Sequence, residues 1–185
     1  MAEKYSIRLG STGGQGIIKG AMVLAEAAII DGKNATQTQV YGPESRGGAT
    51  KAEVNISNER ILFPLVSSPN IVLCLSIGAW QTFTKDMPPG STLILDSSLE
   101  NGPALPEGVT VYRFPMIKMA YEDLGNILST NIVAVGVLNG LMKLVSSDAA
   151  ERSIAIGFKK TFVDGNIKAY ELGYQAASEY LQAAK

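Results

Sequence analysis

The first residues that could bind a ligand form a glycine-rich stretch near the N-terminus, Gly10-Ser11-Thr12-Gly13-Gly14-Gln15-Gly16. It follows an alternating segment over 5–9, typical of a strand, and precedes a segment over 17–30 with apolar residues at helical spacing. A turn at such a junction directs free backbone N–H groups and the positive end of the helix dipole at a ligand. The stretch is therefore predicted to be a turn that can bind phosphate.

The spacing of these glycines separates the stretch from the standard nucleotide-binding motifs. The dinucleotide fingerprint needs glycine at its first, third and sixth positions, and no starting glycine here satisfies that pattern. The P-loop ends in Gly-Lys-Ser/Thr, whereas Lys19 stands alone before Gly20. A standard NAD, FAD or nucleoside triphosphate site is not predicted, and a purely structural tight turn remains the alternative.

A second unusual stretch follows the strand predicted over 35–40 and runs Tyr41-Gly42-Pro43-Glu44-Ser45-Arg46-Gly47-Gly48. It holds an aromatic residue, an acid, a hydroxyl and an arginine among glycines and a proline, which is more than a plain connection requires. Arg46 is a candidate to meet a phosphate or a carboxylate of a ligand or of another subunit. The alternative is a long exposed loop in which Glu44 and Arg46 are only solvated.

Composition excludes several kinds of site. The net charge is −1, with 16 basic and 17 acidic residues, so nucleic acid is not an expected partner. One cysteine and no histidine cannot supply an iron–sulfur cluster, a zinc site or an internal disulfide. Cys74, within the apolar run 71–75, is predicted to be buried. No signal peptide core and no apolar run near the ~20 residues that span a bilayer are found, which predicts a cytoplasmic protein without a membrane segment.

Between the first helix and the last third of the chain, segments typical of strands alternate with segments typical of helices. Strands are predicted over 35–40, 51–57, 71–76, 92–96 and 109–114, and short helices over 78–84 and 117–124. The segment 51–57, which follows the second glycine-rich stretch, alternates between apolar and polar residues, and this predicts a strand with one exposed face. Together these elements predict a single α/β domain over residues 1–185, with a Rossmann-like, mixed but mostly parallel sheet flanked by helices.

The final third is predicted to be helical. Ser129-Thr130-Asn131 offers N-caps for a helix over 132–145 that is apolar nearly all round, which predicts burial in the core or against another chain. A further helix is expected over 148–158. The last helix is predicted to begin near Asp164 or Gly165 and to pack on the same domain through an amphipathic seam.

The two glycine-rich stretches together resemble the gamma subunit of 2-oxoacid:ferredoxin oxidoreductases. The resemblance rests on Gly13 to Gly16 in the first strand–helix turn, Ala25-Glu26-Ala27-Ala28 in the helix, and Tyr41 to Gly48 after the second strand. The segment 61–64 and the helix from Asn131 also sit where that family has them, so the likeness spans the chain. Its specificity lies in the presence of both motifs in the right order.

This resemblance implies a place in an enzyme that oxidatively decarboxylates a 2-oxoacid on thiamine diphosphate and releases an acyl-CoA. Electrons would pass through iron–sulfur clusters to ferredoxin or flavodoxin. Thiamine-binding alpha and beta subunits and a ferredoxin-like delta subunit would be the partners, and this chain would hold neither thiamine nor clusters. The Tyr41 to Glu44 form of the second loop is similar to 2-oxoglutarate and pyruvate types, and the whole chain favours 2-oxoglutarate.

Carried over by position, the resemblance also implies which residues meet the phosphates of coenzyme A, with no catalytic residue in this chain. They are Ser11, Thr12, Gly13, Gly14, Gln15 and Gly16 in the turn, Lys19 on the first helical turn, and Arg46 in the second loop. Two other functions stay open on the residues alone. One is a stand-alone nucleotide- or dinucleotide-binding α/β enzyme, and the other is a scaffold without a ligand.

Overall fold

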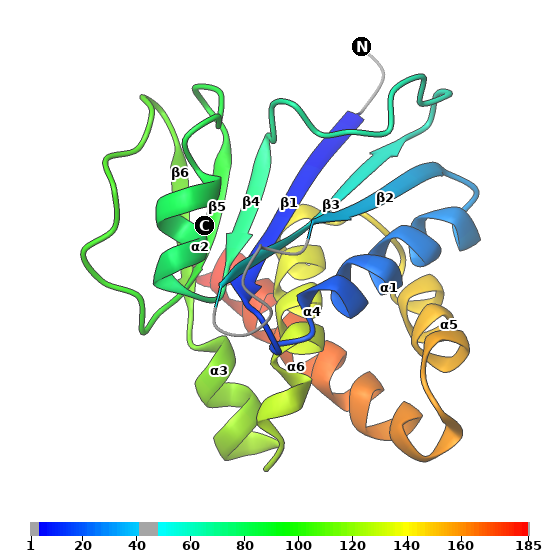
Figure 1. Cartoon of the computed structure of the whole chain (residues 1–185). Coiled ribbons are helices and arrows are strands. Elements are labelled where there is room, and N and C mark those ends of the chain that lie inside the picture. The colour runs from blue at the N-terminus through cyan, green and yellow to red at the C-terminus, as the bar shows by residue number, and fades with distance from the viewer. Residues whose placement is uncertain (1–3, 41–47, 185) are drawn as a thin grey trace.

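The computed structural model describes residues 4–40 and 48–184, which form a six-stranded sheet with helices on both of its faces (Figure 1). The strands are β1 (Lys4–Thr12), β2 (Asn34–Val40), β3 (Ala49–Ser57), β4 (Ile71–Cys74), β5 (Thr92–Asp96) and β6 (Thr110–Phe114). The helices are α1 (Ile17–Ile30), α2 (Ile77–Phe83), α3 (Met116–Lys118), the π-helix η1 (Met119–Asp123), the 3-10 helix η2 (Ile127–Ser129), α4 (Thr130–Met142), α5 (Ser147–Gly157) and α6 (Lys160–Ala183).

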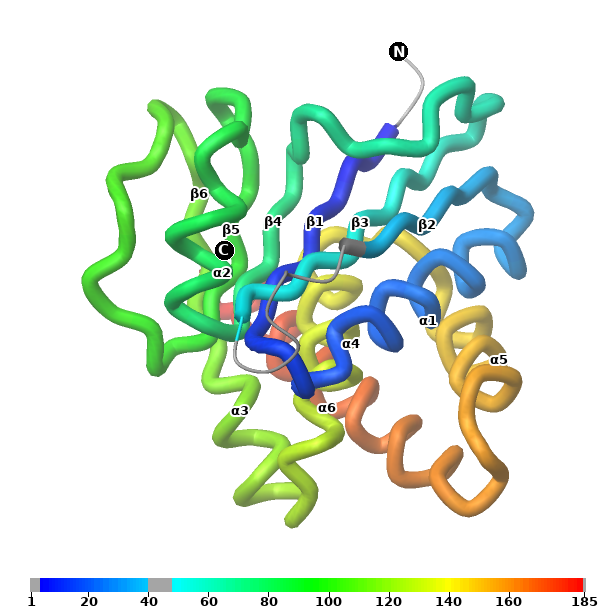
Figure 2. Tube along the Cα trace, viewed as in Figure 1, coloured from blue at the N-terminus to red at the C-terminus, as the bar shows by residue number. Residues whose placement is uncertain are grey.

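The strand order β2-β3-β1-β4-β5-β6 makes the sheet mixed but mostly parallel. β4, β5 and β6 extend the sheet from β1 in parallel, while β3 runs antiparallel to both β1 and β2. Figure 2 shows α1 leading from β1 towards β2 on one side, whereas β4 lies on the other side of β1. The order therefore reverses between β1 and β4, and ligands of open α/β sheets bind beyond the carboxyl ends of the strands at such a switch point. The predicted Rossmann-like class is confirmed.

Apolar side chains fill a layer on each face of the sheet. On one face, Ile7, Leu9 and Val54 pack with residues of α1, α4, α5 and α6. On the other face, Val72 and Cys74 pack with residues of α2. Cys74 is fully buried, as predicted, and burial raises the pKa of its thiol. The thiol therefore stays protonated, as expected of a packing residue rather than a nucleophile.

Helix α4, predicted to be apolar all round, is buried along most of its length. Its closest neighbour is α6, which it approaches at positions where both helices carry glycine. A Cβ atom on Gly136 would lie 2.1 Å from the carbonyl oxygen of Tyr170, and one on Gly173 would lie 2.1 Å from the carbonyl oxygen of Val133. The two backbones are therefore in direct contact, which only glycine permits.

Helices α4 and α6 begin two or more residues earlier than predicted. α6 begins at Lys160 rather than at Asp164 or Gly165, and nothing lies within 4 Å of a Cβ atom on Gly165. A single glycine costs only about 1 kcal/mol in a helix interior, so it did not mark the helix start. α4 begins at Thr130, and its N-terminus carries no side-chain cap. Asn131, predicted as a possible cap, has a different contact, described with the site.

The face of β3 predicted to be exposed is buried, and this prediction was wrong. Glu53 and Asn55 have exposed fractions of 4% and 1%. Arg8 of β1 lies 2.7 Å from Glu53, measured from Nε to Oε1, and also pairs with Asp86 beyond α2. Asn55 donates from Nδ2 to the carbonyl oxygen of Pro64 at 3.0 Å, so the loop after β3 lies over this face. The alternation was correct, but its polar residues have partners distant in the sequence.

The Asp86 carboxylate gives the fold a modest pH dependence. Burial raises the pKa of Asp86, but the hydrogen bond and the charge of Arg8 lower it by more, so it lies below the ordinary value. The pair therefore contributes stability above about pH 4 and loses it as the pH falls through the lowered pKa. Because the Asp86 side chain is 47% exposed, we expect about 1 kcal/mol or less. Urea unfolding between about pH 6 and about pH 3 should show a smaller pH dependence in Asp86→Asn, and identical curves would contradict this.

Candidate functional site

The glycine-rich turn connects β1 to α1 at the switch point of the sheet. β1 continues through Thr12, so the turn itself runs from Gly13 to Gly16, and Gly16 is the N-cap of α1. Gly14 and Gly16 have φ angles of 99° and 70°, a region in which other residues are strained. The conformation of the turn therefore requires glycine at these two positions. Gly13 and Gly14 are exposed.

Hydrogen bonds between neighbouring residues and to Gly48 hold the turn in shape. The N–H of Thr12 donates to Oε1 of Gln15 at 2.8 Å, and the N–H of Gln15 donates to the carbonyl of Thr12 at 3.2 Å. The N–H of Gly13 donates to the carbonyl of Gly48 at 3.0 Å. Ser11 is buried, and its hydroxyl donates to the carbonyl of Thr12 at 3.1 Å. These contacts occupy Ser11 and Gln15 and fix the path of the backbone.

Four other backbone N–H groups around the start of α1 are unpaired within the part of the chain that the structure describes. Within the described residues, the N–H groups of Gly14, Gly16, Ile17 and Ile18 have no hydrogen-bond acceptor. α1 has no side-chain cap and no acidic residue in its first turn. Unpaired donors at the positive end of a helix are the arrangement that binds phosphate or another anion.

Asn131 supports the turn from the other side. Its Nδ2 donates to the carbonyl of Gly16 at 2.9 Å, across 115 residues of chain. A Cβ atom on Gly16 would lie 2.9 Å from the same Nδ2, so a side chain at this position would displace the Asn131 amide. Sequence reasoning missed this role, because an Asn before an apolar helix is more simply interpreted as an N-cap.

Lys19 and Arg46 are the two basic residues predicted to meet the phosphates, and the structure describes only Lys19. Lys19 lies on the first turn of α1, and its Nζ is 5.1 Å from the ring centroid of Phe158, which follows α5. Its ammonium group is thus engaged with an aromatic face, at a distance typical of a cation–π contact. Arg46 and the rest of the second loop from Tyr41 to Gly47 lie outside the described residues.

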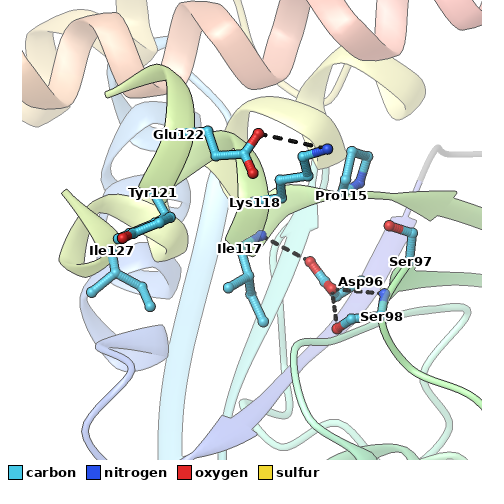
Figure 3. A pocket seen from close by; sticks show the side chains of 9 residues that line it. All are labelled: Asp96, Ser97, Ser98, Pro115, Ile117, Lys118, Tyr121, Glu122 and Ile127. Carbon is cyan, nitrogen blue, oxygen red and sulfur yellow. Dashed lines mark hydrogen bonds and ion pairs between the residues drawn. The ribbon is translucent and has the colours of Figure 1, made fainter. Parts of the chain in front are cut away.

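A cavity of about 520 Å³ opens at the carboxyl ends of β5 and β6, beside η1 (Figure 3). Its lining residues are Asp96, Ser97, Ser98, Pro115, Ile117, Lys118, Tyr121, Glu122 and Ile127. Asp96 is buried and accepts from the N–H groups of Ser98 and Ile117 at 3.0 and 2.9 Å. Lys118 and Glu122 form an ion pair of 3.6 Å. The sequence did not predict this cavity, because its walls come from separate segments.

Within residues 4–40 and 48–184, no three cysteine, aspartate or glutamate side chains gather as a metal site. In the same part of the chain, no helix has the length and the apolar character that crossing a membrane requires.

The fold and the turn define a Rossmann-like α/β domain with a glycine-rich turn at its switch point. The chain belongs to the pyruvate ferredoxin/flavodoxin oxidoreductase family, which matches residues 6–176. The predicted resemblance to gamma subunits of 2-oxoacid:ferredoxin oxidoreductases is thereby confirmed.

Three similar proteins illustrate this membership. The chain is 41% identical over 178 residues to the 2-oxoglutarate synthase subunit KorC of Methanocaldococcus jannaschii, with 95% of each chain covered. It is 37% identical to the gamma subunit of a keto/oxoacid ferredoxin oxidoreductase from Geobacter sulfurreducens, with a TM-score of 0.82 over 95% of this chain and 99% of that chain. A 2-oxoglutarate:ferredoxin oxidoreductase from Magnetococcus marinus, solved with 2-oxoglutarate, coenzyme A and succinyl-CoA bound, shares the fold at 22% identity and a TM-score of 0.85. That match covers 96% of this chain and 31% of the other.

Proposed function

We propose that this chain is the gamma subunit of a multi-subunit 2-oxoacid:ferredoxin or flavodoxin oxidoreductase, with 2-oxoglutarate favoured over pyruvate as the substrate. The whole enzyme converts the 2-oxoacid to an acyl-CoA. The 41% identity to a 2-oxoglutarate synthase subunit over nearly the whole chain supports this substrate. In this proposal the chain performs no bond-breaking step and is inactive alone.

The phosphates of coenzyme A are proposed to bind at the glycine-rich turn. The observation that carries this proposal is the set of unpaired N–H groups at the start of α1. The diphosphate of coenzyme A is anionic, and these donors and the helix dipole stabilise such a group. The Magnetococcus marinus enzyme, whose structure contains coenzyme A, has this fold in one part of its chain. The proposed contacts are Ser11, Thr12, Gly13, Gly14, Gln15, Gly16, Lys19 and Arg46.

The other cofactors are proposed to lie in partner subunits. Thiamine diphosphate belongs to alpha and beta subunits, and iron–sulfur clusters belong to a ferredoxin-like delta subunit that passes electrons to ferredoxin or flavodoxin. Cys74 is the single cysteine of this chain and is buried beneath α2, whereas a cluster needs about four protein ligands. We propose one domain over residues 1–185 in a cytoplasmic complex, without nucleic acid or membrane partners.

A matched pair of variants tests the coenzyme A site. Gly14→Asp and Gly14→Asn impose the same backbone strain at φ 99°, and nothing lies within 4 Å of a Cβ atom there, so they differ mainly in charge. Two like charges about 5 Å apart repel by about 3 kcal/mol at an effective dielectric constant of 20. We therefore expect the Asp variant to raise the KM for coenzyme A at least tenfold above the Asn variant, in the native complex purified through a tag on this chain.

The same kinetic experiment contains its controls. The KM for the 2-oxoacid and the kcat at saturating coenzyme A should be equal in the two variants. Equal KM values for coenzyme A in the Asp and Asn complexes would contradict the proposed site. A purified chain that binds a dinucleotide without partner subunits would favour a stand-alone enzyme instead.

A further inference from the structure

Strand β2 forms one edge of the sheet, and its sequence has none of the features that usually protect an open edge (Figure 1). Protected edges are short, bulged, charged or interrupted by proline, because free backbone groups otherwise pair with another strand. The register of β2 with β3 runs without a bulge from Asn34↔Ser57 to Val40↔Lys51. The strand has no charged residue and no proline, since it reads Asn34-Ala35-Thr36-Gln37-Thr38-Gln39-Val40.

The opposite edge of the sheet, β6, does carry such features. It is five residues long and includes the exposed Arg113. Tyr112 of β6 also packs edge-on against Tyr180 of α6, with 5.8 Å between the ring centroids. A short strand with a charged side chain resists pairing with another chain. Of the two edges, β2 is therefore the one suited to pair with a further strand.

Three exposed apolar side chains lie beside the middle of β2. They belong to the loop after β3, have exposed fractions of 86%, 62% and 53%, and are called the β3-loop patch: Leu62, Phe63 and Leu65. The carbonyl oxygen of Pro64 accepts from Oγ1 of Thr36 at 3.2 Å and from Nδ2 of Asn55 at 3.0 Å. These bonds hold the patch over β2 and β3. Large apolar side chains grouped on a surface are typical of a protein interface.

The sequence of β2 is complementary to itself. In an antiparallel pair of two β2 strands centred on Gln37, Thr36 lies opposite Thr38 of the second copy, and Ala35 lies opposite Gln39. Threonine pairs across two strands are favourable, and an uncharged strand brings no like charges together in this pairing. A two-fold antiparallel pair also closes on itself, as most homo-oligomers do.

The same symmetry brings the two β3-loop patches together. The two-fold axis of an antiparallel strand pair is perpendicular to the sheet, so both patches lie on the same face. Thr36, which bonds to Pro64, then lies about 7 Å along the strand and about 5 Å across from its own copy. A second copy of this chain therefore supplies both a strand for the open edge and an apolar cover for the patch. We infer that β2 pairs antiparallel with β2 of a second copy, with the two β3-loop patches packed together.

Gln37→Cys tests the strand pairing in the native complex purified through a tag on this chain. Residue 37 meets its own copy at the two-fold axis, and the native Cys74 is buried, so background linkage is low. Gln39→Cys is the matched control. Gln39 is more exposed than Gln37, but it lies about 14 Å from its own copy, which is too far for a disulfide. With oxidised glutathione, we expect at least about tenfold more disulfide-linked homodimer from Gln37→Cys than from Gln39→Cys on non-reducing gels.

Phe63→Asp, added to Gln37→Cys, tests the contact between the patches. A carboxylate is costly in an apolar contact, so we expect about tenfold less disulfide-linked homodimer. Ile156→Asp is the control, since Ile156 lies on α5 and has an exposed fraction of 65%, close to that of Phe63. It should leave the linkage unchanged.

Three outcomes would overturn the inference: no linkage of Gln37→Cys, equal linkage of Gln39→Cys, or linkage of Gln37→Cys to a chain of another sequence. Equal linkage with Phe63→Asp and Ile156→Asp would contradict the packing of the patches. If circular dichroism shows that Gln37→Cys does not fold, the double variant Ala35→Cys with Gln39→Cys probes the same register. It should form the homodimer where Gln39→Cys alone does not. None of these results depends on where coenzyme A binds.

Discussion

Gly136→Ala is expected to destabilise the protein by about 3 kcal/mol. The cost is larger if α4 and α6 cannot move apart to accommodate the new methyl group. The new Cβ atom would lie 2.1 Å from the carbonyl oxygen of Tyr170 and 2.9 Å from the backbone nitrogen of Tyr174. Both neighbours are backbone atoms of α6, so no side-chain rotation relieves the overlap and the helices must move apart. Overpacking of this kind typically costs 1–3 kcal/mol or more. It exceeds the gain of about 1 kcal/mol that alanine brings to a helix interior.

Gly165→Ala separates the gain in helix propensity from the cost of overpacking. Gly165 lies inside α6, and nothing is within 4 Å of a Cβ atom there, so only the helix propensity changes. We expect Gly165→Ala to stabilise the protein by about 0.5–1 kcal/mol. The free energies of unfolding of both variants can be measured by urea titration. A Gly136→Ala protein as stable as the original would contradict the direct contact of α4 and α6.

Arg8→Met is expected to cost about 3 kcal/mol, because it leaves Glu53 buried without its closest cation. Both side chains are about 5% exposed, and removing one partner of a buried pair typically costs 3–5 kcal/mol. Lys51, at 3.0 Å from Glu53, keeps part of the compensation and places the expected cost at the lower end. Burial lowers the pKa of Arg8, but Asp86 and Glu53 raise it by more, so the guanidinium is charged at all relevant pH values.

The double variant Arg8→Met with Glu53→Leu separates the cost of the unpaired Glu53 carboxylate from the cost of lost packing. It removes both members of the pair, and an apolar pair of similar volume is often neutral in stability. We expect the double variant to unfold at higher urea concentration than Arg8→Met alone, with a coupling energy above about 1 kcal/mol. Additive losses in the double-mutant cycle would show that the cost comes from packing rather than from the unpaired carboxylate.

Features encoded in adjacent residues were predicted well. The glycine-rich turn, the mostly parallel sheet and the buried α4 all follow from local spacing and composition, and each is confirmed. The burial of Cys74 followed from the apolar run around it. The role of the turn in binding coenzyme A stays a prediction, as does that of Arg46.

Features that depend on distant partners were not predicted. The polar face of β3 is covered because Arg8 and the Pro64 carbonyl reach Glu53 and Asn55, and no local pattern shows those contacts. The bond from Asn131 to Gly16 likewise joins helices far apart in the sequence. Periodicity shows which side of an element is apolar, but the tertiary fold decides whether its polar side meets water or another segment.

Amide hydrogen exchange of this chain within the purified complex, with and without coenzyme A, shows whether coenzyme A binds at the glycine-rich turn. We expect coenzyme A to slow exchange at the amides of Gly14, Gly16, Ile17 and Ile18, because these unpaired donors become bonded to phosphate oxygens. Amides of Thr92 and Leu93, at the beginning of β5 and the opposite edge of the sheet, should not change. A complex that turns over with coenzyme A while exchange in the turn is unaltered would contradict the proposed site, because the phosphates of coenzyme A would then lie elsewhere.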